Sequence, residues 1–197
     1  ARTSLRQLVH ALRAQLHGSD VLPSGPELVL DSATIASDVS EFRAALAAGQ
    51  PAAAVGSYAG SFLDGFYLKG LDEFERWVER ERASLALAYA KALESLAQDA
   101  DERGDLVAAV PYWRRLTETD PISARAALGL MRALDSAGER AAALQHARIY
   151  ELLVREQFGD VPDAAVTQFA SELLSRPAAQ ELRAVRRQPH GRVHRSR

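Results

Sequence analysis

Cationic and apolar side chains alternate at helical spacing in the first residues of the chain. At about 100° per residue, one arc of about 80° holds Arg2, Arg6, His10, Arg13 and His17. The opposite side holds Leu5, Leu8, Val9, Leu12 and Leu16, which we expect to be core positions, and Gly18 ends the predicted helix. Arginine pairs with phosphate oxygens and with guanine, so the cationic arc is a candidate DNA-contacting surface. The alternative is a solvated face of an ordinary amphipathic helix.

Other kinds of site chemistry find no support in the residue pattern. The chain has no cysteine, and its five histidines form no H-x-x-x-H or H-E-x-x-H pair on a predicted helix. Phosphate-binding glycine loops and the G-x-S-x-G nucleophile motif are absent. We therefore expect no catalytic residue, no metal, no cofactor and no identifiable small-molecule ligand, and we expect that the protein is not an enzyme.

Aromatic and alternating charged residues are interpreted as structural. Trp77, Tyr89, Trp113 and Tyr150 could stack on single-stranded nucleic acid, but they lie on predicted apolar faces of an acidic body, so core packing is favoured. The arginines at positions 76, 80 and 82 alternate with the glutamates at 75, 79 and 81, which predicts intrahelical ion pairs.

Charge is distributed unevenly along the 197 residues. Residues 1–17 hold three arginines and no acid, and residues 176–197 hold seven arginines and one glutamate. Because the net charge is −2, residues 18–175 carry −11. The basic tail could add nonspecific affinity for DNA, but a disordered linker is the favoured interpretation. No run is long and apolar enough for a membrane span and no signal peptide is visible, so a cytoplasmic location is expected.

Apolar periodicity predicts an all-α protein after one short hairpin. The hairpin covers residues 21–31, with two apolar runs around Pro23 to Glu27. Asp38 is the expected N-cap of the next helix, with Glu41 at capping-box spacing, and Pro51 and Pro121 are expected in first helical turns. The later helices are predicted at 38–48, 51–58, 72–103, 105–119, 122–136, 139–157 and 163–175, with a loop with aromatic anchors at 60–67.

A repeat lies within the helical part. The segments that begin GDLVAAV at Gly104 and GERAAAL at Gly138 are 34 residues apart, and GQPAAAV at Gly49 is a third copy of the same opening. Helix pairs with this period are typical of tetratricopeptide repeats. Small residues near each helix start should let neighbouring helices approach closely, and a later aromatic residue (Tyr58, Trp113 or Tyr150) should fill the gap.

Several motifs in order resemble the bacterial transcriptional activator domain of the SARP/AfsR-like regulators of antibiotic production in actinomycetes. They are DVSEF at 38–42, YAGSFLDG at 58–65, WVERER at 77–82, Asp120-Pro121, LMRAL at 130–134 and Gly138. The resemblance covers about residues 36–175. It implies a tetratricopeptide-like superhelix whose concave surface contacts proteins such as RNA polymerase or a second protomer.

In that family the domain follows a winged helix of the OmpR type. The segment ARTSLRQLVHALR at 1–13 is similar to its recognition helix, and residues 21–31 are similar to its wing. The resemblance implies DNA contacts by Arg2, Thr3, Arg6, Gln7, His10 and Arg13. The preceding strands and two helices of such a module are absent from the sequence, so we expect that these residues alone do not bind DNA as a complete module.

The expected organisation has three parts. Residues 1–35 are the C-terminal part of a winged-helix DNA-binding domain, residues 36–175 are the activator domain, and residues 176–197 are a basic tail or linker. The expected function is that of a DNA-binding transcriptional regulator. Two alternatives remain: a protein-interaction scaffold of tetratricopeptide type, and the regulatory portion of a multidomain signalling enzyme, neither with DNA binding of its own.

Overall fold

The computed structural model describes residues 2–15, 35–159 and 161–176. The described helices form two compact units, one within residues 1–68 and one within residues 69–197. No strand occurs in the described ranges, and no described helix combines the length and the apolar character that a membrane span requires. The expected hairpin at 21–31 and the tail at 177–197 lie outside the described residues.

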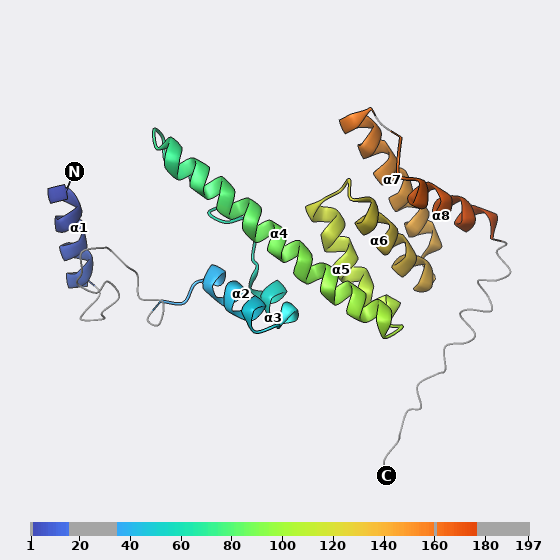
Figure 1. The fold of residues 1–197 in the computed structure, drawn as a ribbon, viewed down its shortest axis with the longest axis horizontal. Helices are drawn as coiled ribbons and strands as arrows, with labels where there is room; N and C mark the ends of the chain where they lie inside the picture. Colours follow the sequence, from blue (N-terminus) through green and yellow to red (C-terminus); the bar gives the residue numbers. More distant parts are fainter. Residues whose placement is uncertain (1, 16–34, 160, 177–197) are drawn as a thin grey trace, which may run out of the picture. The chain divides into compact units, whose positions relative to one another are not determined.

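Three of the described helices belong to the first unit, and Figure 1 labels them. They are α1 (Arg2–Gln15), α2 (Asp38–Ala47) and α3 (Pro51–Ser57). Helices α2 and α3 pack against each other. Phe42 of α2 is buried, and its ring lies 5.5 Å from that of Tyr58, which follows α3.

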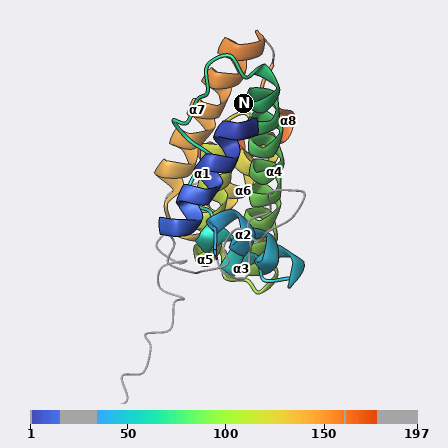
Figure 2. The same ribbon diagram turned by 90° about the vertical axis from the view of Figure 1, so that its left-hand side faces the viewer.

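In the second unit, the described residues form five helices, each of which packs against the next (Figures 1 and 2). They are α4 (Asp72–Glu102), α5 (Leu106–Thr119), α6 (Ala124–Ser136), α7 (Arg140–Phe158) and α8 (Ala164–Ser175). Helix α8 also contacts α6. A hydrogen-bonded ion pair of 2.8 Å between Arg176 and Asp135 joins the end of α8 to α6.

The three copies of the repeat opening share one local structure. Gly49, Gly104 and Gly138 each follow a helix with a positive φ, of 66°, 72° and 81° respectively. Each glycine and the residue after it donate backbone hydrogen bonds into the last helical turn in the Schellman pattern, for example Gly104 N to Asp101 O and Asp105 N to Ala100 O, both 2.9 Å. A residue with a β-carbon would be strained in this conformation, so glycine explains why the three turns look alike in sequence.

Five residues after each of these glycines stands a fully buried alanine. Ala54, Ala109 and Ala143 all have 0% exposed surface. This confirms that small residues permit close helix approach near each helix start. The expectation for the later aromatics is confirmed for Trp113 and Tyr150, which are buried, whereas Tyr58 is half-buried against Phe42.

The expected N-cap of α2 was wrong by one residue, and the expected start of α6 was wrong by two. The N-cap of α2 is Ser37 and not Asp38: Ser37 has an extended φ of −128°, and its hydroxyl accepts from the Ser40 backbone N–H at 3.1 Å. The Ser40 hydroxyl in turn accepts from the Ser37 N–H at 3.1 Å, which completes a capping box. Pro121 precedes α6 and does not lie in its first turn, because Ser123 caps that helix and accepts from the Ala126 N–H at 3.3 Å.

Trp77 was expected in the core and is 40% exposed. Its ring packs against Phe74 one turn earlier, with centroids 5.6 Å apart. Val78, the next residue, is fully buried. At this level of α4 the core-facing position is therefore Val78, whereas Trp77 lies partly in solvent. Trp113, by contrast, is only 5% exposed.

Candidate functional site

Helix α1 carries the residues expected to contact DNA. The helix spans Arg2–Gln15, in agreement with the prediction, but its side chains at positions 2–6, which include Arg2, Thr3 and Arg6, lie outside the described ones. Gln7 and His10 are exposed, and Arg13 is half-buried in the last turn, where a cation interacts favourably with the helix dipole. DNA contact by these residues stays a prediction.

The apolar side of α1 departs from expectation. Leu8 is 61% exposed and Leu12 is 46% exposed, although both were expected in a core, whereas Val9 is buried. Leu5 and Leu16 fall outside the described side chains. Periodicity identifies which face of a helix is apolar, but burial depends on a second surface that covers the face.

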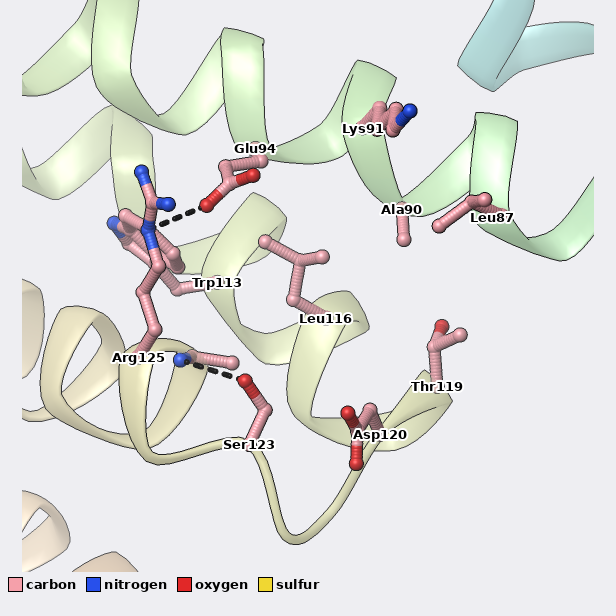
Figure 3. Close-up of a pocket in the computed structure, with 11 residues that line it drawn as sticks. Leu87, Ala90, Lys91, Glu94, Trp113, Leu116, Thr119, Asp120, Ser123 and Arg125 are labelled. Carbon is pink, nitrogen blue, oxygen red and sulfur yellow. Dashed lines mark hydrogen bonds and ion pairs between the residues drawn. The ribbon is translucent and has the colours of Figure 1, made fainter. Parts of the chain in front are cut away.

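In the second unit, a pocket of about 230 Å³ lies between α4, α5 and the start of α6 (Figure 3). Leu87, Ala90 and Leu116 provide apolar walls. An ion pair between Glu94 of α4 and Arg125 of α6 stands on one side. Eleven residues line the pocket: Leu87, Ala90, Lys91, Glu94, Trp113, Leu116, Thr119, Asp120, Ser123, Arg125 and Ala126.

Trp113 of α5 forms the inner wall of this pocket. An added β-carbon at Gly129 of α6 would lie 2.5–2.7 Å from atoms of the Trp113 ring, so glycine is what lets α6 approach the indole. The indole Nε1 is buried and has no hydrogen-bond partner within the described residues, and the same holds for Oδ1 of Asp101 on α4. Burial raises the pKa of Asp101, and the neighbouring indole N–H and the Arg132 guanidinium oppose this effect.

In residues 2–15, 35–159 and 161–176, no three His, Asp or Glu side chains come together as a metal site. The sequence pattern alone does not reveal the pocket, because its residues come from three helices. The sequence of α4 does show that Leu87 and Lys91 are one helical turn apart and so lie on the same side of the helix. The structure shows that both side chains are exposed.

A second titratable group, His146 of α7, gives a prediction for pH dependence. Its Nε2 is buried with no hydrogen-bond partner in the described part of the chain, and burial lowers its pKa below the ordinary value of 6.5. As pH falls, the unfolded chain therefore binds this proton first, and the free energy of unfolding decreases below about pH 6.5.

We expect His146→Leu to lose less stability than the wild type between pH 7.5 and pH 5.5. Urea unfolding followed by circular dichroism at the two pH values measures the difference. His10→Gln, at an exposed position of α1, serves as the control and should lose as much as the wild type. Equal losses in the wild type and His146→Leu would mean that His146 does not contribute.

Comparison with known proteins gives a family match and a fold match. The model of the family described as "Bacterial transcriptional activator domain" matches residues 30–174. Among solved structures, EmbR of Mycobacterium tuberculosis, in complex with a low affinity phosphopeptide, is similar with a TM-score of 0.54 and 22% sequence identity. The similarity covers 93% of this chain and 52% of that one, so the chain spans about half the length of the EmbR chain. No curated protein is significantly similar to the chain.

Proposed function

Because the chain belongs to the bacterial transcriptional activator domain family, we propose that it is part of a DNA-binding transcriptional regulator. In this proposal α1 contacts DNA, and the helices that follow it contact proteins. The match of residues 30–174 is the observation that carries the proposal. No bond-making or bond-breaking chemistry is assigned to these residues.

The DNA-contacting part is proposed to be the remnant of a winged helix in residues 1–35. The helical form of α1 and the exposure of Gln7 and His10 support this assignment. The exposed Leu8 and Leu12 also support it, because a recognition helix packs its apolar side against the other helices of its module. Arg2, Thr3, Arg6, Gln7, His10 and Arg13 are the proposed DNA-contacting residues.

The protein-contacting part is proposed to be the activator domain at 36–175, followed by a basic linker at 176–197. Its successive packed helices support a tetratricopeptide-like arrangement. RNA polymerase and a second protomer are the proposed partners. EmbR, whose chain has a similar fold over 52% of its length, is in complex with a phosphopeptide.

The test uses the full reading frame that contains these 197 residues. Its binding to duplex DNA is measured by fluorescence anisotropy over a range of salt concentrations. Each phosphate that the protein neutralises contributes about 0.9 to the slope of log affinity against log salt. We expect Arg6→Ala and Arg13→Ala each to reduce that slope by about one, and Gln7→Ala to lower the preference for the cognate sequence.

Arg148→Ala on α7 is the matched control, because Arg148 is an exposed arginine outside α1. It should leave the slope and the affinity unchanged. If Arg6→Ala and Arg13→Ala behave like Arg148→Ala, α1 does not contact DNA, and the scaffold alternative takes the place of the regulator.

A further inference from the structure

Helix α4 presents a cationic face within an otherwise acidic body. At about 100° per residue, Arg76, Arg80, Leu87 and Lys91 fall within an arc of about 60°. These four residues, here called the α4 cationic face, are all exposed, with Leu87 at 59%. They lie on the other side of the helix from the buried Leu85 and Leu93.

Among the described residues, no ion pair neutralises the cations of this face. The acidic residues on the same arc are Glu73, in the first turn of α4, and Glu94, whose carboxylate pairs with Arg125. In the part of the chain that the structure describes, Arg76, Arg80 and Lys91 form no ion pair. By contrast, Arg82 pairs with Glu79 at 2.7 Å on the neighbouring side of the helix. Three cations thus remain available to an outside partner.

The face leads directly into the pocket beside α5. Leu87 and Lys91 belong both to the α4 cationic face and to the pocket lining (Figure 3). The pocket volume of about 230 Å³ exceeds that of a cavity of about 150 Å³ that holds benzene, so one large apolar side chain fits. Apolar walls next to unpaired cations are complementary to a ligand that is both apolar and acidic.

We propose that the α4 cationic face binds an acidic amphipathic helix of a protein partner. One leucine or aromatic side chain of that helix enters the pocket, and its acidic residues lie against Arg76, Arg80 and Lys91. From Arg76 to Lys91 the face extends about 22 Å, which is the length of about four turns of a partner helix. The inference rests on the protein-contacting half of the proposed function and names the chemistry of the partner.

Nucleic acid fits this surface less well than such a helix. The phosphate backbone offers charge but no apolar side chain for Leu87 and the pocket. Moreover, residues 18–175 carry a net charge of −11, which repels DNA over the whole body. An acidic peptide is repelled too, but its apolar anchor can bury surface in the pocket.

The test is fluorescence anisotropy of a labelled 16-residue helical peptide that has leucine and phenylalanine in one stripe and six glutamates along the borders of that stripe. We expect the 197-residue chain to bind it and to bind the version with glutamine in place of glutamate at least tenfold more weakly. Arg80→Glu and Lys91→Glu should each weaken binding of the acidic peptide about tenfold, as should Leu87→Ala.

Two matched controls and one competitor make the outcome decisive. Arg114→Glu reverses an exposed charge on α5, and Leu174→Ala truncates a leucine with 62% exposure on α8; neither should change binding. The proposal is overturned if the peptide does not bind, if a scrambled acidic peptide binds equally well, or if the controls weaken binding as much as the variants of the face. Equal competition by a short DNA duplex would also overturn it. Since no DNA contact by α1 enters the assay, its failure leaves the DNA-binding half of the proposed function standing.

Discussion

Replacing Trp113 with alanine is expected to lower the free energy of unfolding by about 3–5 kcal/mol. Trp113 is 5% exposed and forms the inner wall between α4, α5 and α6. Its truncation would leave a cavity between α4, α5 and α6 that these packed helices cannot fill. The loss should be measured by urea unfolding with circular dichroism at 222 nm, because the substitution removes one of the two tryptophans and so changes the fluorescence signal itself.

Trp77→Ala is the control for this result. Both residues are tryptophans on amphipathic helices, but Trp77 is 40% exposed and its ring contacts that of Phe74. Its replacement should cost about 1–2 kcal/mol, because it loses one aromatic contact and only part of the burial that Trp113 loses. A loss at Trp77 equal to that at Trp113 would show that the core is wrongly placed.

Gly129→Ala should destabilise the protein by about 1–3 kcal/mol, although alanine normally favours a helix over glycine. The added β-carbon would lie 2.5 Å from the Trp113 ring, which is far inside the normal contact distance. The flat indole cannot swing aside as a flexible side chain would, since α4 and α5 confine it. Urea unfolding measures the effect.

Two comparisons isolate the clash as its cause. Gly56→Ala, within α3, meets no atom within 4 Å and should stabilise by roughly 0.5–1 kcal/mol. In a Trp113→Leu background, Gly129→Ala should lose most of its penalty, because the ring it meets is gone. If the penalty stays the same in that background, the close approach of Gly129 and Trp113 is not its source.

Helix number, helix ends and the repeat could be predicted from sequence because their signals are local. A glycine with positive φ after each repeat helix and a buried alanine five residues later leave a visible pattern at Gly49, Gly104 and Gly138. The N-cap of α2 was misplaced by one residue for an equally local reason. Ser37 and Asp38 are both good caps, and each has a suitable residue three positions later, so only the backbone geometry decides between them.

The helices that bury each helix face could not be predicted from the sequence, because burial depends on how neighbouring helices pack. Trp77 and Trp113 have the same residue type and similar helical spacing, yet only Trp113 is enclosed by α4, α5 and α6. The pocket likewise exists only where three helices meet. The cations at 76 and 80 are visible in sequence, but their alternation with glutamates predicts intrahelical ion pairs. The contact between Arg82 and Glu79 is such a pair, whereas Arg76 and Arg80 form none among the described residues.

If these residues belong to a regulator that reads DNA sequence, the full reading frame that contains them should prefer one DNA sequence strongly over others. Duplexes are selected from a random pool by the full reading frame, and the affinity for the enriched sequence is compared with that for its scrambled version at about 150 mM salt. We expect a ratio of at least about 10³, which is the lower range for sequence-specific regulators. A ratio near one, or no enrichment at all, would contradict the account and leave a protein-interaction scaffold in its place.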